Sequence, residues 1–393
     1  MRILIANDGF GGAGGVQSYL ENVVAGLLSR GHEIAMLYRD AVPDVVPPTT
    51  MNGLPLFSVG RDGADRAFEA VRTWGPAICF SNNMCDLAIE KRLLTRAPVV
   101  RFMHGYNGTC ISGQKSFGLP TVTPCDRRFG AACLALYLPR RCGEVSLSSL
   151  VQGYGLGRAQ QALFNRYRAI VVASEHMQRE YVRNGADAHR VHVNRLFPTH
   201  EARADDIPGE IAPSVVFLGR MTRLKGGGLL VRAVAEASRR LGTAIRLTMV
   251  GDGPQRPGWE RLASRLQVAC TFTGWQSGDE RWNWVRRASL LAVPSAWPEP
   301  FGLVGLEAAA LGVPAIAFDV GGIREWLTPG ENGYLVADDP PRASAFADGL
   351  VSAFQDPEGL RAMRAKSLVA GRRFSLERHL DRLEDILKQH AGH

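Results

Sequence analysis

Strand and helix patterns alternate along the whole chain, and this order constrains the fold more than any other feature. Short apolar runs with the character of buried strands occur at Arg2–Ala6, Val99–Met103 and Val215–Leu218. Helical periodicity follows the first of them, over residues 16–30. Such alternation requires parallel sheets covered by helices on both faces. Because 393 residues suffice for two hydrophobic cores, we expect an α/β protein of two domains.

A change of composition marks the expected domain boundary. Residues 198–213 are polar and contain prolines, as in a linker between domains. We therefore assign residues 1–197 to an N-terminal Rossmann-like domain and residues 214–370 to a C-terminal one. Residues 371–393 contain a charged helical pattern that closes the chain.

Two carboxylates with seven residues between them lie in an almost entirely apolar segment. Residues 302–311 form a short helical pattern that is apolar on every side, and Glu307 lies inside it. Glu299 lies just before this helix, where free N–H groups favour anions. The N–H groups of Phe301, Gly302 and Leu303 suit a phosphate there. The alternative is structural: Glu299 as a helix-terminal charge and Glu307 in a buried ion pair.

Two cations follow the strand pattern that begins at residue 215. Arg220 comes directly after this strand, and Lys225 precedes the next helical pattern. At the carboxyl end of a parallel strand, two cations can neutralise a diphosphate and its growing charge as a sugar leaves. The alternative is ordinary solvated surface charge.

The acidic segment is similar to a known family motif. The run Pro-Glu-Pro-Phe-Gly-Leu-Val-Gly-Leu-Glu-Ala at 298–308 resembles the donor-site motif of family 4 glycosyltransferases, which have the GT-B fold. The resemblance extends, in the family's order, through Gly312–Ala317, the pair Gly321-Gly322 and Pro329–Val336. It implies two Rossmann-like domains with parallel sheets facing an interdomain cleft, the first binding the acceptor and the second the donor.

The resemblance also implies roles for individual residues. Glu299 would bind hydroxyls of the transferred sugar, Glu307 the ribose of the nucleotide, and Arg220 with Lys225 the diphosphate. The implied reaction moves a hexose from a nucleotide diphosphate sugar to a hydroxyl of a glycan or lipid-linked glycan, with retention of configuration. It needs no metal at the reacting centre and no further cofactor. The family's last helix commonly crosses back onto the first domain.

The first loop supports a competing interpretation. Gly9-Phe-Gly-Gly-Ala-Gly14 matches G-x-G-x-x-G between a strand and a helix, and Asp40 ends the second strand pattern. An NAD-dependent enzyme is therefore an alternative, although it leaves residues 215–336 unexplained. In the family a glycine-rich loop lines the cleft, which makes Gly14 and Gly15 candidates for close backbone approach.

His104 follows the strand pattern that ends at Met103, so we expect it at the carboxyl edge of a sheet. Family members carry a histidine at the corresponding strand end, close to the transferred sugar. By that resemblance His104 orients a hydroxyl rather than acting as the sole base. The alternative is a structural histidine packed in the protein.

Four of the seven cysteines lie close together in the sequence, at Cys110, Cys125, Cys133 and Cys142. A four-thiolate zinc site is one interpretation, although the spacings lack the usual close pairs. Reduced, locally packed cysteines are the favoured one, and redox-active thiols are a third.

The same region is basic. Between residues 115 and 168 there are eight Lys and Arg against two Asp and Glu, interleaved with aromatic residues. Such an insertion, which we place at about 105–168, fits an anionic membrane surface, an acceptor bearing a diphosphate, or simply an arginine-rich surface. No nucleic-acid-binding module is visible. With no membrane span or signal peptide in the sequence, we expect a cytoplasmic protein, peripheral on the inner face of the membrane.

Two other classes stay open: an epimerase of GT-B fold that acts on a nucleotide sugar alone, and a non-catalytic sugar-nucleotide binding protein. The sugar, the base, the linkage and the oligomeric state are not readable from the sequence. Trp275 either borders the base pocket or packs in the core.

Overall fold

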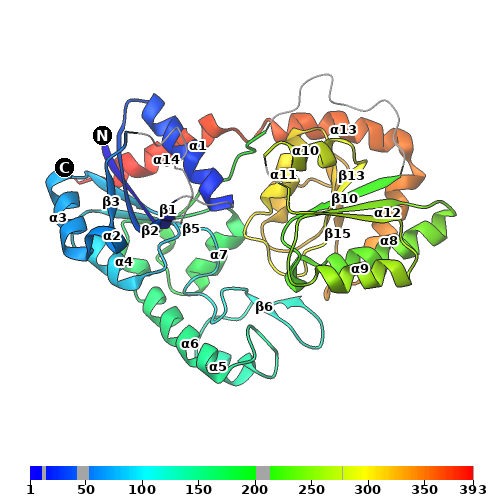
Figure 1. The fold of residues 1–393 in the computed structure, drawn as a ribbon, viewed down its shortest axis with the longest axis horizontal. Helices are drawn as coiled ribbons and strands as arrows, with labels where there is room; N and C mark the ends of the chain where they lie inside the picture. Colours follow the sequence, from blue (N-terminus) through cyan, green and yellow to red (C-terminus); the bar gives the residue numbers. More distant parts are fainter. Residues whose placement is uncertain (11–14, 42–52, 201–212, 277, 393) are drawn as a thin grey trace.

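The computed structural model describes residues 1–10, 15–41, 53–200, 213–276 and 278–392. It contains two large parallel sheets, each with helices on both faces, as the alternating pattern predicts (Figure 1). The α/β class and the two-domain architecture are therefore confirmed.

The N-terminal sheet has seven strands in the order β3-β2-β1-β4-β5-β8-β9. The strands are β1 (Arg2–Phe10), β2 (Glu33–Ala41), β3 (Leu56–Ser58), β4 (Ile78–Ser81), β5 (Val99–Met103), β8 (Ala169–Val172) and β9 (Val191–Val193). The associated helices are α1 (Gly15–Ser29), α2 (Val59–Asp62), α3 (Ala64–Trp74), α4 (Leu87–Leu93) and α7 (Glu175–Arg183). Strands β4, β5 and β8 are buried along their whole length, which explains their continuous apolar runs.

The C-terminal sheet has six strands in the order β12-β11-β10-β13-β14-β15. The strands are β10 (Ser214–Leu218), β11 (Arg246–Val250), β12 (Cys270–Gly274), β13 (Leu290–Val293), β14 (Ala315–Phe318) and β15 (Gly333–Val336). The associated helices are α8 (Gly227–Leu241), α9 (Arg256–Arg265), α10 (Glu280–Arg286), α11 (Leu303–Ala310), α12 (Ala343–Gln355) and α13 (Pro357–Gly371).

Both sheets reverse their strand order once, and this reversal positions the site. The chain runs outward in one direction through β1, β2 and β3, then returns to the other side of β1 with β4. In the second sheet β10 takes the place of β1, and β13 that of β4. Loops that leave the carboxyl ends of the two strands at such a switch point diverge, and ligands bind in the crevice between them. The relevant loops therefore follow β1 and β4, and β10 and β13.

The last helix, α14 (Leu376–His390), lies on the N-terminal domain beside α1 (Figure 1). Arg30 of α1 forms ion pairs with Glu377 and, at 2.8 Å, with Asp381. The hydroxyl of Tyr19 lies 2.9 Å from Nε2 of the buried His379. The chain thus begins and ends on the same domain, and α14 joins the two halves after the second sheet is complete.

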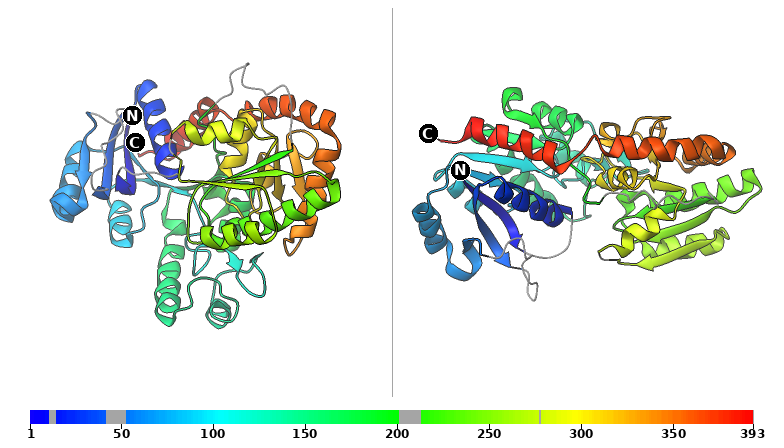
Figure 2. Two further views of the ribbon diagram at one scale, coloured as in Figure 1. Left: turned by 45° about the vertical axis from the view of Figure 1, so that its right-hand side comes forward. Right: turned by 90° about the horizontal axis from the view of Figure 1, so that it is seen from above.

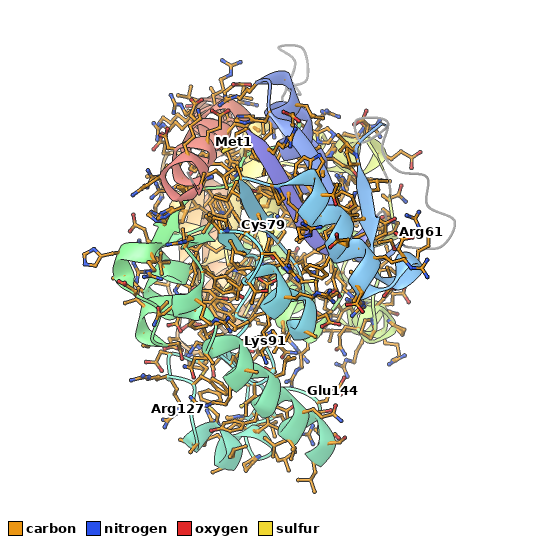
Figure 3. The ribbon with its side chains drawn as sticks, turned by 90° about the vertical axis from the view of Figure 1, so that its left-hand side faces the viewer. Met1, Arg61, Cys79, Lys91, Arg127 and Glu144 are labelled. Atoms are coloured by element: carbon orange, nitrogen blue, oxygen red, sulfur yellow. The ribbon has the colours of Figure 1, made fainter. Side chains whose placement is uncertain are left out.

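A small lobe extends from the N-terminal domain between β5 and β8 (Figures 1 and 2). It comprises the two-stranded ribbon β6 (Ser116–Phe117) and β7 (Thr123–Pro124), α5 (Ala132–Tyr137) and α6 (Leu147–Gln161). Figure 3 shows its side chains, with Arg127 and Glu144 labelled. The buried Lys115 ties the lobe to α7 through an ion pair with Glu180 at 2.9 Å. Across the domain junction, Arg223 donates a hydrogen bond of 3.0 Å to the carbonyl of Gly118.

Over the described ranges, every helix is too short or too polar to pass through a lipid bilayer.

Candidate active site

The two expected cations follow β10 at the switch point of the second sheet. Arg220 lies two residues beyond the strand; its side chain is exposed and has no hydrogen-bond or ion-pair partner among the described residues. Lys225 ends the short 3-10 turn Arg223–Lys225. Gly226 then adopts a φ of 69°, and a Cβ there would lie 1.8 Å from the carbonyl oxygen of Pro294. Glycine is therefore required for the β10 loop to approach the β13 loop so closely.

Glu299 lies in the loop after β13 and is surrounded by donors. Its Oε1 accepts hydrogen bonds from Lys225 Nζ at 2.7 Å, from Trp297 Nε1 at 3.0 Å and from the hydroxyl of Ser295. The residue is only 4 % exposed, so these donors offset the cost of burying its charge. Sequence reasoning paired Lys225 with a diphosphate, whereas the structure pairs it with Glu299. A ligand phosphate would therefore share this ammonium group with the carboxylate.

The backbone around Glu299 is held by a glycine turn. The Gly322 N–H donates to the Glu299 carbonyl at 2.7 Å. Gly321 has a φ of 62°, and a Cβ there would lie 2.5 Å from the nitrogen and 2.3 Å from the oxygen of Glu299. Only glycine fits at this position. The pair Gly321-Gly322 therefore sets the position of the Glu299 main chain.

Helix α11 begins directly after this loop. Gly302 precedes the helix with a φ of 83°, and Trp326 Nε1 donates to the Phe301 carbonyl at 2.7 Å. In the described part of the chain no group accepts a hydrogen bond from the N–H groups of Gly302 and Leu303. These are the orphan donors that a helix N-terminus offers to an anion. The structure thus places the three backbone groups expected at residues 301–303 at the start of α11, beside Glu299.

Glu307 lies in the second turn of α11 and is buried, at 6 % exposure. Its Oε1 accepts a hydrogen bond of 2.8 Å from the hydroxyl of Thr199. Burial raises the pKa of Glu307 to about 7, although the hydrogen bond from Thr199 opposes this shift. No ion pair with Glu307 is formed within the described residues, so the structural alternative of a buried ion pair does not hold.

His104 lies at the carboxyl end of β5, as expected, and is partly buried. Its Nε2 lies 3.1 Å from Oδ1 of Asn82, whose amide nitrogen donates to the Phe80 carbonyl. Since Oδ1 can only accept, Nε2 carries the proton and Nδ1 keeps a lone pair. Burial, with a contribution from Arg101, lowers the pKa of His104 to about 3. The imidazole is therefore neutral and offers an acceptor to a hydroxyl.

The glycine-rich loop after β1 is only partly described. Gly14 lies outside the described residues. Gly15 is the first residue of α1; it is exposed, and a Cβ there would meet no atom within 4 Å. β1 continues to Phe10, so Gly9 belongs to the strand rather than to a tight turn after it. This differs from the dinucleotide fingerprint, in which the first glycine forms that turn.

Contacts from the first domain reach the Glu299 loop on both sides. Tyr106 donates a hydrogen bond of 2.8 Å to the Pro298 carbonyl, and Ser174 donates one of 2.6 Å to the Pro300 carbonyl. Sequence reasoning missed these two residues and Thr199. Ser174 had a detectable signal, because a serine directly before a helical pattern is typical of an N-cap. No sequence signal indicated its second contact, with the Pro300 carbonyl of the other domain.

The cysteine group does not form a metal centre in the structure. Among the described residues, which include all seven cysteines, no three or more potential ligands are close enough to hold a metal ion. Each thiol is free, and Cys142 instead donates to the Leu136 carbonyl at 3.7 Å. Burial and the neighbouring thiols raise the pKa of Cys142 to about 12. The described residues therefore give no support to the four-thiolate zinc interpretation.

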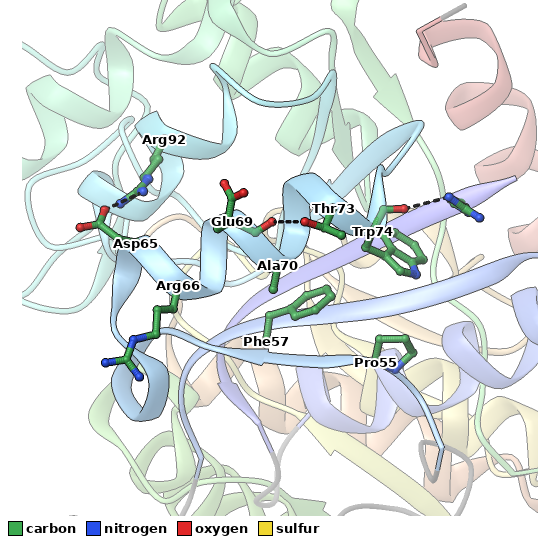
Figure 4. A pocket seen from close by; sticks show the side chains of 10 residues that line it. Pro55, Phe57, Asp65, Arg66, Glu69, Ala70, Thr73, Trp74 and Arg92 are labelled. Carbon is green, nitrogen blue, oxygen red and sulfur yellow. Dashed lines mark hydrogen bonds and ion pairs between the residues drawn. The ribbon is translucent and has the colours of Figure 1, made fainter.

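Two further surface features lie away from these residues. Trp275 is 61 % exposed, so it is not a packed core residue. A groove of about 1050 Å³ lies between α3 and the edge strand β3, lined by Phe57, Trp74 and paired charges such as Asp65 and Arg92 (Figure 4). None of the expected site residues lines it.

Comparisons with known proteins agree with this geometry. A family model described as glycosyl transferase 4-like domain matches residues 14–196, and one described as glycosyl transferases group 1 matches residues 212–356.

Several curated relatives align with part of the chain. A D-inositol 3-phosphate glycosyltransferase of Nocardia farcinica is 37 % identical over 177 residues, which are 43 % of this chain and 38 % of that protein. An alpha-D-kanosaminyltransferase of Streptomyces kanamyceticus is 32 % identical over 181 residues, 45 % of this chain and 46 % of that protein. The matches thus span less than half the length of these relatives.

Solved structures resemble the whole chain. The Anabaena protein HepE in complex with UDP has a TM-score of 0.71 at 18 % identity, covering 99 % of this chain and 100 % of HepE. Sucrose-phosphate synthase of Thermosynechococcus elongatus has a TM-score of 0.72 at 19 % identity, covering 99 % and 98 %. At such identities the likeness shows the fold, which is GT-B.

Proposed function

Because the chain belongs to the family 4 glycosyltransferases of GT-B fold, we propose that it transfers a hexose from a nucleotide diphosphate sugar. The acceptor in this proposal is a hydroxyl of a glycan or lipid-linked glycan. The transfer retains the configuration of the anomeric carbon, and it requires neither a metal at the reacting centre nor a further cofactor.

The observation that carries the proposal is the group formed by Lys225, Glu299 and the start of α11. An ammonium group, a buried carboxylate and free backbone N–H groups meet where the β10 and β13 loops diverge. The N–H groups and Lys225 suit a diphosphate, and the carboxylate suits sugar hydroxyls on the neighbouring ring. A single nucleotide sugar offers both chemical groups side by side.

Charge stabilisation explains the chemical step. As the bond to the diphosphate breaks, negative charge grows on the leaving oxygens, and Lys225 with the helix N-terminus stabilises it. Arg220 has no protein partner in the described residues, so its guanidinium is available for the same charge. Glu299 is engaged by three donors and is poorly suited to attack the anomeric carbon. We therefore favour same-face attack, in which the leaving diphosphate accepts the acceptor proton.

Glu307 and His104 have positioning roles in this proposal. The Glu307 carboxylate accepts from ribose hydroxyls, and Thr199 is the hydroxyl that occupies it in this structure. The lone pair of His104 Nδ1 accepts from a hydroxyl of the transferred sugar or of the acceptor. Both roles need the domains close together, which the contacts of Tyr106 and Ser174 with the Glu299 loop provide.

A thermal-shift screen with UDP-, GDP- and ADP-sugars tests donor binding first. UDP-sugars lead the screen because the Anabaena structures contain UDP and UDP-glucose. We expect one donor class to raise the melting temperature of the wild type, and a smaller shift for Glu307→Ala. The absence of a shift with every donor would contradict the proposal.

Turnover of the donor selected by that screen tests the catalytic role of Arg220. We expect Arg220→Ala to melt like the wild type and to lose roughly 10²-fold or more in turnover. Arg239→Ala, which removes an exposed arginine on α8, is the matched control and should keep wild-type turnover. Equal rates in the two variants would refute the role of Arg220.

The epimerase alternative is separated by incubation with a labelled donor alone. An epimerase converts the donor into its isomer without any acceptor, whereas the proposed transferase gives only slow hydrolysis. Isomer formation at a rate unaffected by acceptor would replace the transferase assignment.

We also propose that the small lobe docks on an anionic membrane surface, at the inner face of the cytoplasmic membrane. Seven large hydrophobic side chains are exposed in the described residues, and five of them lie on this lobe. We call these five the apolar ridge: Leu134, Val145, Leu147, Val151 and Leu156. Exposed arginines accompany the ridge at positions 127, 128, 141 and 158. Apolar side chains flanked by cations match the chemistry of an anionic bilayer surface.

A further inference from the structure

A second groove, lined by Gly321 and by residues of both domains, contains a cluster of arginines. It has a volume of about 730 Å³, which is within the range of small-molecule sites. Its lining includes six arginines, at positions 179, 195, 324, 373, 378 and 382. Two glutamates, Glu175 and Glu325, are the only acidic lining residues. None of the residues assigned to the donor lines this groove.

The six arginines come from three separate parts of the chain. Arg179 and Arg195 belong to the N-terminal domain, on α7 and after β9. Arg324 lies between β14 and β15 of the second sheet, and Arg373 lies just after α13. The remaining two are on α14, which crosses back to the first domain. The groove therefore lies at the junction of both domains with the crossing helix.

The carboxylates present do not neutralise this set. Glu325 pairs with Arg195 at 2.7 Å, and Glu175 pairs with the same arginine at 3.1 Å. Arg373 pairs with Glu331 at 2.6 Å, outside the lining. Arg179 has only a 4.0 Å contact with Glu175. Arg324 pairs with Asp319 at 2.5 Å, also outside the lining. Once these four carboxylates are counted, the six arginines leave a formal excess of two positive charges.

The two arginines of α14 lack an acidic partner altogether among the described residues. Arg378 donates only to the Arg373 carbonyl, at 2.9 Å, and Arg382 forms no ion pair with a described residue. They are one helical turn apart, where like charges repel. Arg378 also lies in the first turn of α14, where the helix dipole disfavours a cation. An anion in the groove would relieve both unfavourable interactions.

The buried polar groups of the groove add no charge. Burial lowers the pKa of His176 and of His379 to about 4, so both are neutral near pH 7. Nε2 of His176 is buried and has no hydrogen-bond partner, which leaves this nitrogen free for a ligand or water. The buried histidines of the groove lining therefore add no positive charge to that of the arginines.

We propose that this groove binds a small anion carrying two phosphoryl groups, and that the anion links the two domains. Guanidinium groups bind phosphoryl oxygens in bidentate fashion, and a ligand with two such groups can engage arginines of both domains at once. Gly321 forms part of the lining, and its neighbour Gly322 donates to the Glu299 carbonyl. An anion bound beside Gly321 would therefore lie next to the residue whose N–H holds the Glu299 main chain.

Inorganic pyrophosphate is the probe, titrated by calorimetry into the full chain and its variants. We expect Arg378→Ala/Arg382→Ala to weaken binding by at least about 10-fold, because charged hydrogen bonds are lost. Arg239→Ala/Arg361→Ala removes the same charge from exposed sites on α8 and α13 and should bind like the wild type. Arg220→Ala/Lys225→Ala disables the proposed donor site and should also keep groove binding. Loss of binding only in this last variant would place the anion at the donor site and overturn the proposal.

Arginine modification provides a test that needs no variant. Phenylglyoxal labels exposed guanidinium groups, and peptide mass spectrometry gives the extent at each position. Pyrophosphate should protect Arg378 and Arg382 several-fold while leaving Arg239 unchanged. Equal labelling of Arg378 and Arg382 with and without pyrophosphate would refute the site, whatever the outcome of the donor assays.

Discussion

The Lys225 ammonium group lies 2.7 Å from Glu299 Oε1 and joins the loop after β10 to the loop after β13. The Glu299 side chain is only 5 % exposed, whereas that of Lys225 is 31 % exposed. Water can therefore solvate the ammonium group without its partner, but it cannot solvate the carboxylate. The ion pair therefore contributes to the stability of the second domain as well as to the proposed donor site.

Removing Lys225 should therefore affect stability as well as activity. We expect Lys225→Ala to lower the free energy of unfolding by about 1–3 kcal/mol, because a buried carboxylate loses its cation. Adding Glu299→Gln should recover most of that loss, since no buried charge is left unpaired. Urea unfolding of both variants measures this. Arg2→Ala breaks an exposed pair with Glu33 and should cost less than about 1 kcal/mol. Equal losses for Lys225→Ala and Arg2→Ala would contradict the prediction.

A methyl group at Gly321 should displace Glu299. The added Cβ meets the Glu299 main chain at 2.3 Å and also forces an alanine into a left-handed backbone conformation. We expect Gly321→Ala to destabilise the protein by at least about 2 kcal/mol and to weaken donor binding. Gly330→Ala has a similar φ of 75° but meets no atom within 4 Å, so it isolates the backbone cost of about 1 kcal/mol. In thermal unfolding, Gly321→Ala should therefore lower the melting temperature more than Gly330→Ala does.

Glu307 should give the protein a distinctive pH dependence. Its pKa is raised from 4.5 to about 7 by burial, so the folded state binds this proton more tightly than the unfolded state. The resulting penalty is absent below pH 4.5, grows as the pH rises to about 7, and is constant above. Glu307→Gln removes it while keeping an acceptor for Thr199. We expect the variant to gain up to a few kcal/mol over the wild type at pH 8 and nothing at pH 4.5. A constant difference across this range would exclude a raised pKa.

His104 should stay neutral over the working pH range. Because its pKa is lowered to about 3, NMR of the imidazole should show no titration between pH 5 and 8. Asn82→Asp places a carboxylate 3.1 Å from Nε2 and should raise the pKa of His104 back toward the usual range. Titration near 6.5 in the wild type would show that the ring is not desolvated as the structure indicates.

The apolar ridge predicts binding to anionic vesicles. Phosphatidylglycerol vesicles should sediment the wild type at low salt, and binding should weaken as salt screens the arginines. Leu147→Ser/Val151→Ser should reduce sedimentation several-fold, since these side chains are 68 % and 67 % exposed. Val369→Ser, at 58 % exposure on α13, is the matched control. Unchanged sedimentation in the ridge variant would rule the surface out.

The sequence by itself determined the fold class and most of the donor end. Alternating patterns of period 2 and 3.6 depend on local burial, so they are visible without any tertiary contact. Arg220, Lys225 and Glu299 could be selected because they follow strand patterns or precede a helix, and parallel strands bring their carboxyl ends to one edge. The resemblance of residues 298–336 to a family motif supplied the expected roles.

Tertiary structure decided which groups touch. The contacts of Lys225 with Glu299, of Thr199 with Glu307 and of Tyr106 with the Pro298 carbonyl join residues 74 to 192 positions apart. The same holds for the arginine groove, whose six cations come from segments far apart in the chain. Sequence spacing carries no information on such distances, because the crossing of α14 and the packing of one domain on the other fix them. Burial likewise raised the pKa of Glu307 and lowered that of His104. A pKa depends on the solvent and charges around a group in space rather than on its neighbours in the chain.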